Sequence, residues 1–384
     1  MRVLLKNVHL LDAEREYMPA DVLVDGEDIA ATGADLASGD AEVVDLSGYT
    51  LMPGFFDAHM HAARRGRDNE DMLRAYARNG VCAVADLGIT GVGTLEHHME
   101  FLRGLYTPEY PYITSAGRFV DVPEGYGMGP EAGMAWGIQV ECAEDIRAAV
   151  EYLAQGGANG VKTGISDGIV GTIRAAMDRD MMTLLADEAR RRGLWSAAHI
   201  GRVKDLRTVV ECGIDQAAHT PGDEEMDDEL VALMVTRSIP MTTTMGDMTG
   251  THPMNIPPSY GTLKVFNEHR RIMQKNLKKF YDAGGTILIG TDLAKSDDFE
   301  EDAVIPYFEL AQLLDAGIPM RDAIRCGTSN PAKVFGFERL GLVEPGMKAC
   351  MIAFPGALDD AFKALDHPPF VINRGQILTE PAAR

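Results

Sequence analysis

Two histidines stand two residues apart in an apolar run of the chain, GFFDAHMH at residues 54–61. In an extended strand, side chains at positions i and i+2 point to the same face, so His59 and His61 can act on one ligand. Two neutral imidazoles held on a buried strand supply half of the donor set that zinc prefers. Taken alone, the pair also fits two surface histidines. The metal interpretation therefore depends on the rest of the chain.

Further polar residues end other apolar runs in the same manner as this pair. They are Lys162, His199, His219 and Asp292. Separately, each has an ordinary structural explanation, such as a hydrogen-bonded core histidine, a lysine paired with a carboxylate, or a turn. Burying four imidazoles, an ammonium and a carboxylate together without a metal ion would be costly. The set as a whole therefore predicts a metal site.

These residues must be positioned by an alternating pattern of strands and helices. Short apolar runs of strand character occur at residues 54–61, 81–87, 111–116, 160–165, 195–200, 213–219, 238–244 and 286–292. Amphipathic helical stretches lie between them, for example at residues 144–155, 177–192, 204–212, 224–237 and 263–283. Eight strand–helix units predict a closed parallel barrel or a doubly wound sheet. The length of the chain, and the lack of a phosphate-type glycine loop after the first strand, favour an α/β fold of the (β/α)8 TIM-barrel type.

The two ends of the chain have a different character. Residues 1–50 contain short β-rich runs separated by turn residues, and the C-terminal segment has similar runs. Because chain ends often lie close together, we expect an accessory β-sandwich domain built from residues 1–50 and 341–384. Residues 51–340 would then form the barrel, with the active site at the C-terminal ends of its strands.

The motifs together resemble the amidohydrolase superfamily over essentially the whole chain, nearest its imidazolonepropionase-like and metal-dependent dipeptidase (prolidase-like) branch. The matching segments are residues 53–61, the strands ending in Lys162, His199 and His219, the Gly-Thr-Asp at 290–292, and a tail running from 328–332 through 341–346. Two positions depart from the family pattern. Ala349-Cys350-Met351 stands where Ala-Asp-Leu is usual, and the second strand lacks a frequent arginine. Neither touches a ligand position, so both concern substrate and subclass.

The resemblance implies a site with two divalent ions, which we expect to be zinc. By that similarity His59 and His61 hold the more buried ion, and His199 and His219 hold the second. Asp292 would bind the first ion and move protons. Lys162 would be carboxylated by carbon dioxide and bridge both ions. A carbamate turns a cation into an anionic oxygen donor, which explains a lysine among histidine ligands.

The implied activity is hydrolysis of an amide-type carbon–nitrogen bond by a metal-bridging hydroxide, with a cyclic amide, a dipeptide or an N-acyl amino acid as substrate. Loops must set the specificity, and the long segments 119–137 and 245–260 are the main candidates. Arg202, near His199, could bind a substrate carboxylate, and Tyr126 and His252 are candidates from the two loops. The arginines at positions 64, 65 and 67 could also hold an anion.

Two alternatives stay open. A mononuclear zinc deaminase of the same superfamily would commonly have a glutamate three residues after the fifth-strand histidine, where this chain has Arg202, and would not need Lys162. A non-catalytic scaffold relative would tend to lose metal ligands, whereas this chain keeps all six. The number of bound ions separates the three: about two, about one, or none.

The charge composition of the chain indicates which kinds of partner it can bind. The chain has 384 residues with 36 Lys and Arg against 58 Asp and Glu, a net charge of -22. Such an acidic surface repels nucleic acids and anionic lipids, and no apolar run is long enough to span a membrane. We therefore expect a cytoplasmic protein with a small-molecule substrate, and a homo-oligomer. Five scattered cysteines without a Cys-x-x-Cys pair are expected to be free, buried thiols.

Overall fold

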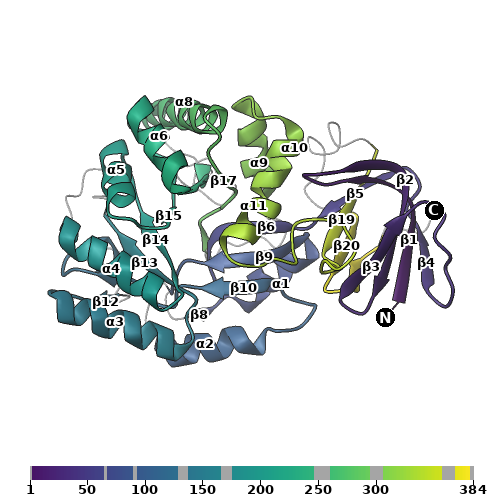
Figure 1. The fold of residues 1–384 in the computed structure, drawn as a ribbon, viewed down its shortest axis with the longest axis horizontal. Helices are drawn as coiled ribbons and strands as arrows, with labels where there is room; N and C mark the ends of the chain where they lie inside the picture. The colour runs from purple at the N-terminus through teal and green to yellow at the C-terminus, as the bar shows by residue number, and fades with distance from the viewer. Residues whose placement is uncertain are drawn as a thin grey trace.

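The computed structural model describes residues 2–64, 67–89, 93–128, 137–165, 175–245, 260–294, 306–356 and 368–380. Inner parallel strands are flanked by helices, and a separate sheet combines the purple N-terminal strands with the yellow C-terminal ones (Figure 1). All five cysteines are free, and all but the exposed Cys142 are buried. Among the described residues, no helix has the length and apolarity needed to cross a bilayer.

The inner strands form two parallel sheets. One has the order β10-β9-β6-β18, from Tyr112–Ser115, Val81–Asp86, Phe55–His61 and Leu293–Ala294. The other has the order β13-β14-β15-β16-β17, from Gly160–Gly164, Trp195–His199, Gln216–Ala217, Met241–Thr242 and Ile287–Leu288. Each of the eight predicted strand runs thus contains a strand, and sequential strands pair in parallel as βαβ units require.

Isolated hydrogen bonds cross both gaps between these sheets. The amide of Ala58 donates to the carbonyl of Ile289 at 2.8 Å, between β6 and the end of β17. The amide of Asn159 donates to the carbonyl of Ser115 at 2.8 Å, between the start of β13 and β10. The ladders themselves do not trace a closed barrel among the described residues. A mixed α/β fold with parallel inner sheets is therefore what the structure establishes.

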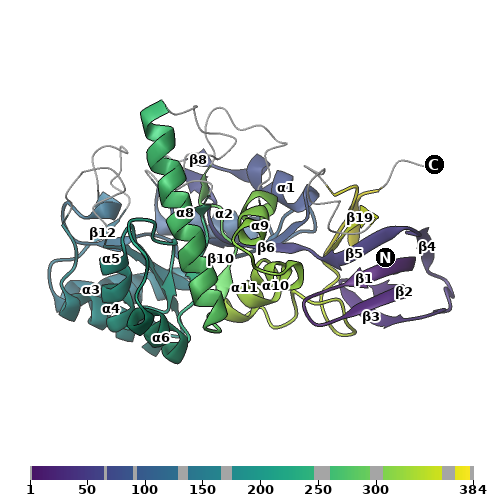
Figure 2. The ribbon, with the colours of Figure 1, turned by 90° about the horizontal axis from the view of Figure 1, so that it is seen from above.

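Helices cover the outside of the inner strands (Figure 1). They are α1 (Glu70–Arg78), α2 (Leu95–Gly104), α3 (Ala143–Gly156), α4 (Arg179–Arg191), α5 (Val203–Glu211), α6 (Asp228–Arg237), α8 (Tyr260–Asp282), α9 (Pro306–Asp315), α10 (Met320–Cys326) and α11 (Ser329–Val334). The long helix α8 lies between α6 and α9 (Figure 2). Helix α3 illustrates the pattern, because its buried residues Ile146, Ala149, Val150 and Leu153 recur at helical spacing. It ends at Gly157 in the left-handed conformation, a common helix stop.

Strands from both ends of the chain join one sheet. Its order is β21-β20-β19-β5-β1-β2-β3, with β4 also on β1. The strands are β1 (Arg2–Leu11), β2 (Glu16–Asp25), β3 (Asp28–Gly33), β4 (Glu42–Asp45), β5 (Tyr49–Pro53), β19 (Met351–Pro355), β20 (Phe370–Asn373) and β21 (Gln376–Thr379). The antiparallel pairing of β19 with β5 joins the two ends. The strands form one continuous sheet, so the predicted β-sandwich is not confirmed, and the domain division stays a prediction.

Five short elements lie in the described parts of the loops. The strands β7 (Ala63–Arg64) and β8 (Arg67–Asp68) form a small hairpin directly after β6. In the predicted loop 119–137, β11 (Val120–Asp121) pairs with β12 (Ile138–Gln139), and a 3-10 turn, η1, covers Tyr126–Met128. Most of the predicted loop 245–260 lies outside the described residues.

The sheet of the chain ends packs against the inner strands at Gly80, which joins α1 to β9. Gly80 has φ +84, and a Cβ built on it would lie 2.3 Å from Cγ2 of Ile352 in β19. We expect Gly80→Ala to lower the free energy of unfolding by roughly 2–4 kcal/mol, because backbone strain and overpacking add. Urea denaturation would measure it.

The matched control is Gly104→Ala in helix α2, where a Cβ would have no heavy atom within 4 Å. Alanine favours a helix over glycine, so this variant should be as stable as the parent or up to about 1 kcal/mol more stable. Equal stability of the two variants would show that the contact between Gly80 and Ile352 does not constrain the fold.

Candidate metal centre

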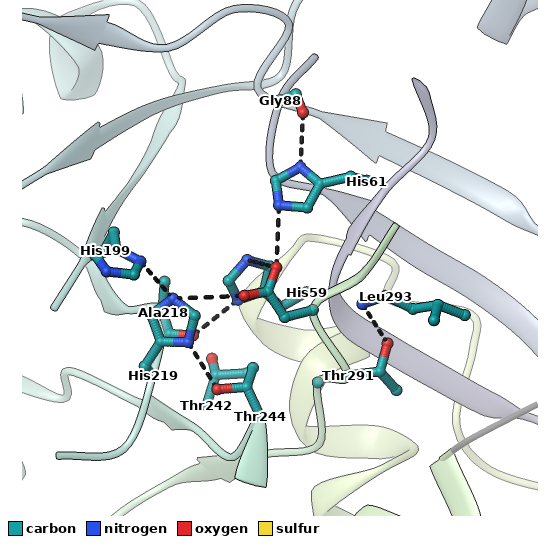
Figure 3. A network of polar contacts seen from close by, with 12 residues as sticks. His59, His61, Gly88, His199, Ala218, His219, Thr242, Thr244, Thr291 and Leu293 are labelled. Carbon is teal, nitrogen blue, oxygen red and sulfur yellow. Dashed lines mark hydrogen bonds and ion pairs between the residues drawn. The ribbon is translucent and has the colours of Figure 1, made fainter. Parts of the chain in front are cut away.

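Two histidines of β6 and the aspartate that follows β17 meet in a buried cluster. The Nε2 atoms of His59 and His61 lie 3.2 and 3.1 Å from Oδ1 of Asp292. One ligand atom from each of these three residues lies within 4.8 Å of the others. His59 and His61 point to the same side of β6 (Figure 3). The predicted two-residue spacing thus places two imidazoles against one carboxylate, a donor set suited to a divalent ion.

Backbone carbonyl groups orient both of these rings. The Nδ1 atom of His59 lies 2.8 Å from the carbonyl oxygen of Ala218, and that of His61 lies 2.7 Å from the carbonyl oxygen of Gly88. Because a carbonyl oxygen can only accept, each Nδ1 carries the hydrogen and donates it. The Nε2 lone pairs are then left facing Asp292. This is the usual arrangement of histidines that bind metals.

A second pair of histidines comes from β14 and the end of β15. The Nδ1 atom of His199 lies 2.7 Å from Nε2 of His219, whose own Nδ1 lies 2.7 Å from Oγ1 of Thr244 (Figure 3). His219 also faces the first pair, with its Nε2 3.9 Å from Oδ2 of Asp292. Two nitrogens on one tetrahedral zinc ion would stand about 3.3 Å apart. These two nitrogens need to separate by only about half an ångström to hold one ion.

Lys162 of β13 is buried, with 1% of its surface exposed. Its Nζ lies 5.6 Å from the ring centroid of Phe119 and makes no ion pair with any described carboxylate. Burial lowers the pKa of this amine to about 7, against the opposing charges of Asp292 and Asp86. A neutral amine is the form that can react with carbon dioxide. Lys162 thus forms no ion pair with Asp86, whose carboxylate contacts His98 and Ser115.

The carboxylate of Asp86 contacts Ser115, His98 and the backbone of Ala62. Its Oδ2 accepts hydrogen bonds from Oγ of Ser115 at 2.5 Å and lies 2.8 Å from Nε2 of His98. Its Oδ1 accepts from the amide of Ala62 at 3.1 Å. Burial opposes the charge on Asp86, but the neighbouring His98 and Ser115 hold the pKa of this carboxyl below its ordinary value. Asp86 therefore fixes the chain directly after His61.

Asp57 ties β6 to the turn that carries Asp292. Its Oδ1 accepts from the amides of His59 and Thr291, both at 3.0 Å. Its Oδ2 accepts from Oγ1 of Thr291 at 2.6 Å and from the hydroxyl of Tyr76 at 3.0 Å. The turn itself is tight, since Asp292 has φ 56. A non-glycine residue in this region indicates a conformation imposed by its surroundings.

The protonation states suit metal binding. Burial lowers the pKa of His59 to about 4 and holds the pKa of His199 and His219 well below the ordinary value. Burial alone would raise the pKa of Asp292, but the nearby imidazoles, His59 first, hold it well below its ordinary range. At neutral pH the site thus contains uncharged nitrogen donors and an ionised carboxylate, as metal coordination requires. The donor set fits one or two divalent ions.

The structure brings one of the predicted substrate-binding residues to the site. The ring of Tyr126 stacks on His199, with centroids 3.7 Å apart and an interplanar angle of 12°. Arg202 is half-buried at the N-cap of α5, three residues beyond His199. His252 and Arg65 lie outside the described residues, as do the side chains of Arg64 and Arg67.

Several supporting residues were not identified from the sequence. Asp57 had a usable signal, since it precedes His59 by two residues and so lies on the same face of the strand. Thr244 ends the predicted strand at 238–244, and nothing in that segment indicates its contact with His219. The contact of Asp86 with His98 joins β9 to α2 and has no sequence signal, because it depends on how the helix packs.

Comparison with known proteins decides the family. The sequence profile of the amidohydrolase family matches residues 50–378. The chain belongs to the amidohydrolase family. Among solved structures, an amidohydrolase aligns with a TM-score of 0.83 and 21% identity, covering 100% of both chains. A Xaa-Pro dipeptidase with methionine in its active site aligns with a TM-score of 0.79 and 20% identity, covering 98% and 99%.

These likenesses show that the chain has the fold of both structures, and the family match confirms the predicted family membership. Among curated relatives, the dihydroorotase of Anoxybacillus flavithermus is 32% identical over 108 residues. That match covers 27% of this chain and 25% of the dihydroorotase. It therefore extends over about a quarter of either protein.

The buried histidines should make the folded chain sensitive to acid when no metal is bound. Their pKa values are lower in the folded chain than the ordinary value near 6.5, so below about pH 6.5 the unfolded chain binds more protons. Stability is then lost as pH falls, by about 1.4 kcal/mol per pH unit for each neutral histidine. We expect His219→Gln to remove one such contribution between about pH 6 and pH 5. Urea denaturation after chelation would measure it.

Asp57 opposes this trend, because burial raises its pKa to about 6 and its protonation stabilises the fold as pH falls. That contribution cancels when the variant is compared with the parent chain. The control is His97→Gln, since the side chain of His97 in α2 is 68% exposed. An unchanged pH slope in His219→Gln would mean that His219 is charged in the folded protein.

Proposed function

We propose that this chain is a binuclear metal-dependent hydrolase that cleaves an amide-type carbon–nitrogen bond. In this proposal His59, His61 and Asp292 hold one divalent ion, and His199 and His219 hold the other. A carboxylated Lys162 bridges the two. Zinc is the expected metal, because it accepts this mixture of imidazole and carboxylate donors in a tetrahedral or five-coordinate site.

The position of Lys162 carries the proposal. Lys162 is buried in β13, which pairs with the strand that carries His199, and it forms no ion pair with a described carboxylate. Burial lowers the pKa of its amine to about 7. A buried cation beside uncharged imidazoles is unfavourable, because the effect of burial on Lys162 outweighs the attraction of Asp292 and Asp86. A carbamate would make it an anionic oxygen donor. Carboxylation of Lys162 would therefore replace an unfavourable buried charge with an oxygen donor for the metal.

The residues of the chain have distinct tasks in the reaction. Bound divalent ions would supply an activated water at neutral pH and polarise the scissile carbonyl. Asp292 is ionised and partly accessible, with 15% of its side chain exposed, so it can accept the proton of that water and return it to the leaving nitrogen. The carbonyl groups of Ala218 and Gly88 keep His59 and His61 aligned throughout.

The class of substrate is inferred from two residues, Tyr126 and Arg202. Tyr126, half-buried and stacked on His199, presents an aromatic wall beside the second ion position. Arg202 stands at the start of α5 and would bind a substrate carboxylate, which favours a dipeptide or an N-acyl amino acid over a neutral ring amide. One of the similar structures is a Xaa-Pro dipeptidase, and one of the curated relatives is a dihydroorotase. Screening dipeptides, N-acyl amino acids and ring amides with the metal-loaded protein would distinguish these classes.

Part of the architecture also belongs to this proposal. We infer that the eight inner strands close into a (β/α)8 barrel, since hydrogen bonds cross both gaps between the two sheets. The metal ligands then share the C-terminal end of the barrel, where such enzymes bind substrate. The division at residues 50 and 341, the homo-oligomer and the cytoplasmic location stay predictions.

Metal content tests the ligand assignment. We expect about two ions per parent chain, and a loss of hydrolysis and of most bound metal in His59→Ala and His219→Ala, because each removes one ion's nitrogen donor. Elemental analysis and circular dichroism would measure metal and folding. His97→Ala, at an exposed position, is the control and should retain both metal and activity. One ion per parent chain would favour the mononuclear deaminase.

Substitution of Lys162 separates the bridging role from a structural one. We expect Lys162→Ala to lose both bound metal and activity, and short carboxylic acids in the buffer to restore part of each by replacing the carbamate. Lys162→Arg should do no better than alanine, because a guanidinium cannot form a carbamate and keeps its charge. Full metal content in Lys162→Ala would remove the lysine from the ligand set.

A further inference from the structure

A pocket of about 320 Å³ lies away from the metal centre, between α2, β10 and the hairpin that joins β20 to β21. No predicted metal ligand is among the residues that line it. Part of its wall is apolar, with Met99, Leu102 and Ile113 among the lining side chains. Arg103 and Arg374 also line it. The proposed hydrolysis does not use this pocket.

Arg374 is buried at the edge of this pocket, with 3% of its surface exposed. Its guanidinium carbon lies 4.1 Å from the ring centroid of Tyr106 and 3.7 Å from that of Tyr112. Its Nη2 donates to the carbonyl of Pro111 at 3.2 Å. The cation is thus held between two aromatic rings, a favourable arrangement that still leaves its in-plane donors free to bind another group.

Most of the hydrogen-bonding capacity of this cluster is unused. The Nε and Nη1 atoms of Arg374 and the hydroxyl of Tyr112 are buried and have no hydrogen-bond partner among the described residues. Arg374 also makes no ion pair with a described carboxylate. Buried polar groups are normally paired, and an arginine offers five N–H donors. The guanidinium of Arg374 therefore makes one hydrogen bond, and its Nε and Nη1 groups lack acceptors among the described residues.

Local backbone geometry does not explain why arginine occupies this position. Arg374 and Gly375 have φ 48 and φ 74, the paired left-handed conformations of a tight hairpin turn. The first position of such a turn favours asparagine, aspartate or glycine. Arginine there breaks the local preference, and such exceptions tend to serve contacts made by the side chain.

The charge of the pocket is opposite to that of the whole chain. Its described lining residues include two arginines and no aspartate or glutamate, whereas the chain carries a net charge of -22. Arg103, in the last turn of α2, is exposed and has no described ion pair. A local positive potential in an acidic protein attracts small anions to that point.

We propose that this pocket binds a small organic anion, a carboxylate carried on an apolar body. The carboxylate would accept from the unused donors of Arg374, with Arg103 at the entrance, and the apolar body would contact Met99, Leu102 and Ile113. Tyr106 lines the pocket, is 66% exposed and covers one face of the guanidinium. Rotation of that single ring opens the donors to the pocket. Arginine forms planar, paired hydrogen bonds with carboxylates, and apolar walls with few polar groups are typical of ligand sites.

Binding of 3-phenylpropanoate to the full chain, measured by ligand-observed NMR and calorimetry, tests the proposal. We expect it to bind, while the uncharged 3-phenylpropan-1-ol and inorganic phosphate bind much more weakly. Arg374→Met should weaken binding about tenfold or more, because it removes the charged donor. Binding should persist after treatment with EDTA, which separates this pocket from the metal centre and makes the result independent of the proposed hydrolysis.

A charge reversal at the entrance keeps the test valid if Arg374→Met does not fold. Arg103→Glu changes an exposed residue in the last turn of α2 and should also weaken binding about tenfold. The matched control is Arg78→Glu, an exposed arginine in the last turn of α1 that does not line the pocket. Equal binding of the alcohol or of phosphate would overturn the proposal. So would no binding to the parent chain, or parent-like affinity in Arg103→Glu.

Discussion

The candidate metal centre depends on the hydrogen bonds of one fully buried carboxylate, that of Asp57. It accepts four hydrogen bonds, and three of them come from backbone or hydroxyl groups of His59 and Thr291. These bonds hold β6 against the turn that carries Asp292, so the imidazoles and the carboxylate meet across two strands that are distant in sequence. Burial raises the pKa of Asp57 to about 6, which shows how expensive its charge would be without those donors. The candidate site therefore depends on a carboxylate whose four described hydrogen bonds all come from groups of the protein.

The sequence predicted that His59, His61 and Asp292 would lie together, as the structure shows, and the reason is physical. Side-chain alternation in a strand fixes which face His59 and His61 share, and in parallel strands the polar ends gather on one side. His199 ends β14 as expected, whereas Lys162 pairs with Ala197 and lies two residues before the end of β13. Local pattern and strand direction were enough for the histidines, because no side-chain packing had to be known.

What the sequence could not predict depends on contacts between distant segments. The pairing of β19 with β5 joins residues about three hundred positions apart into one continuous sheet, and no periodicity signals such a register. The stacking of Tyr126 on His199 depends on the path of a loop, which composition alone does not determine. The contact of Asp86 with His98 depends on how α2 packs against β9.

The departure from the family pattern at position 350 lies beside Asn373 and Arg374, at the hairpin between β20 and β21. The Sγ of Cys350 accepts from the amide of Arg374 at 3.4 Å and donates to Oδ1 of Asn373 at 3.3 Å. Aspartate, the residue usual at this position, would put a buried carboxylate beside the hairpin and offer Arg374 a partner of opposite charge within the protein. A neutral thiol keeps the hairpin hydrogen-bonded without neutralising that guanidinium. The substitution thus leaves the proposed metal ligands untouched and preserves the positive charge of a pocket in an otherwise acidic protein.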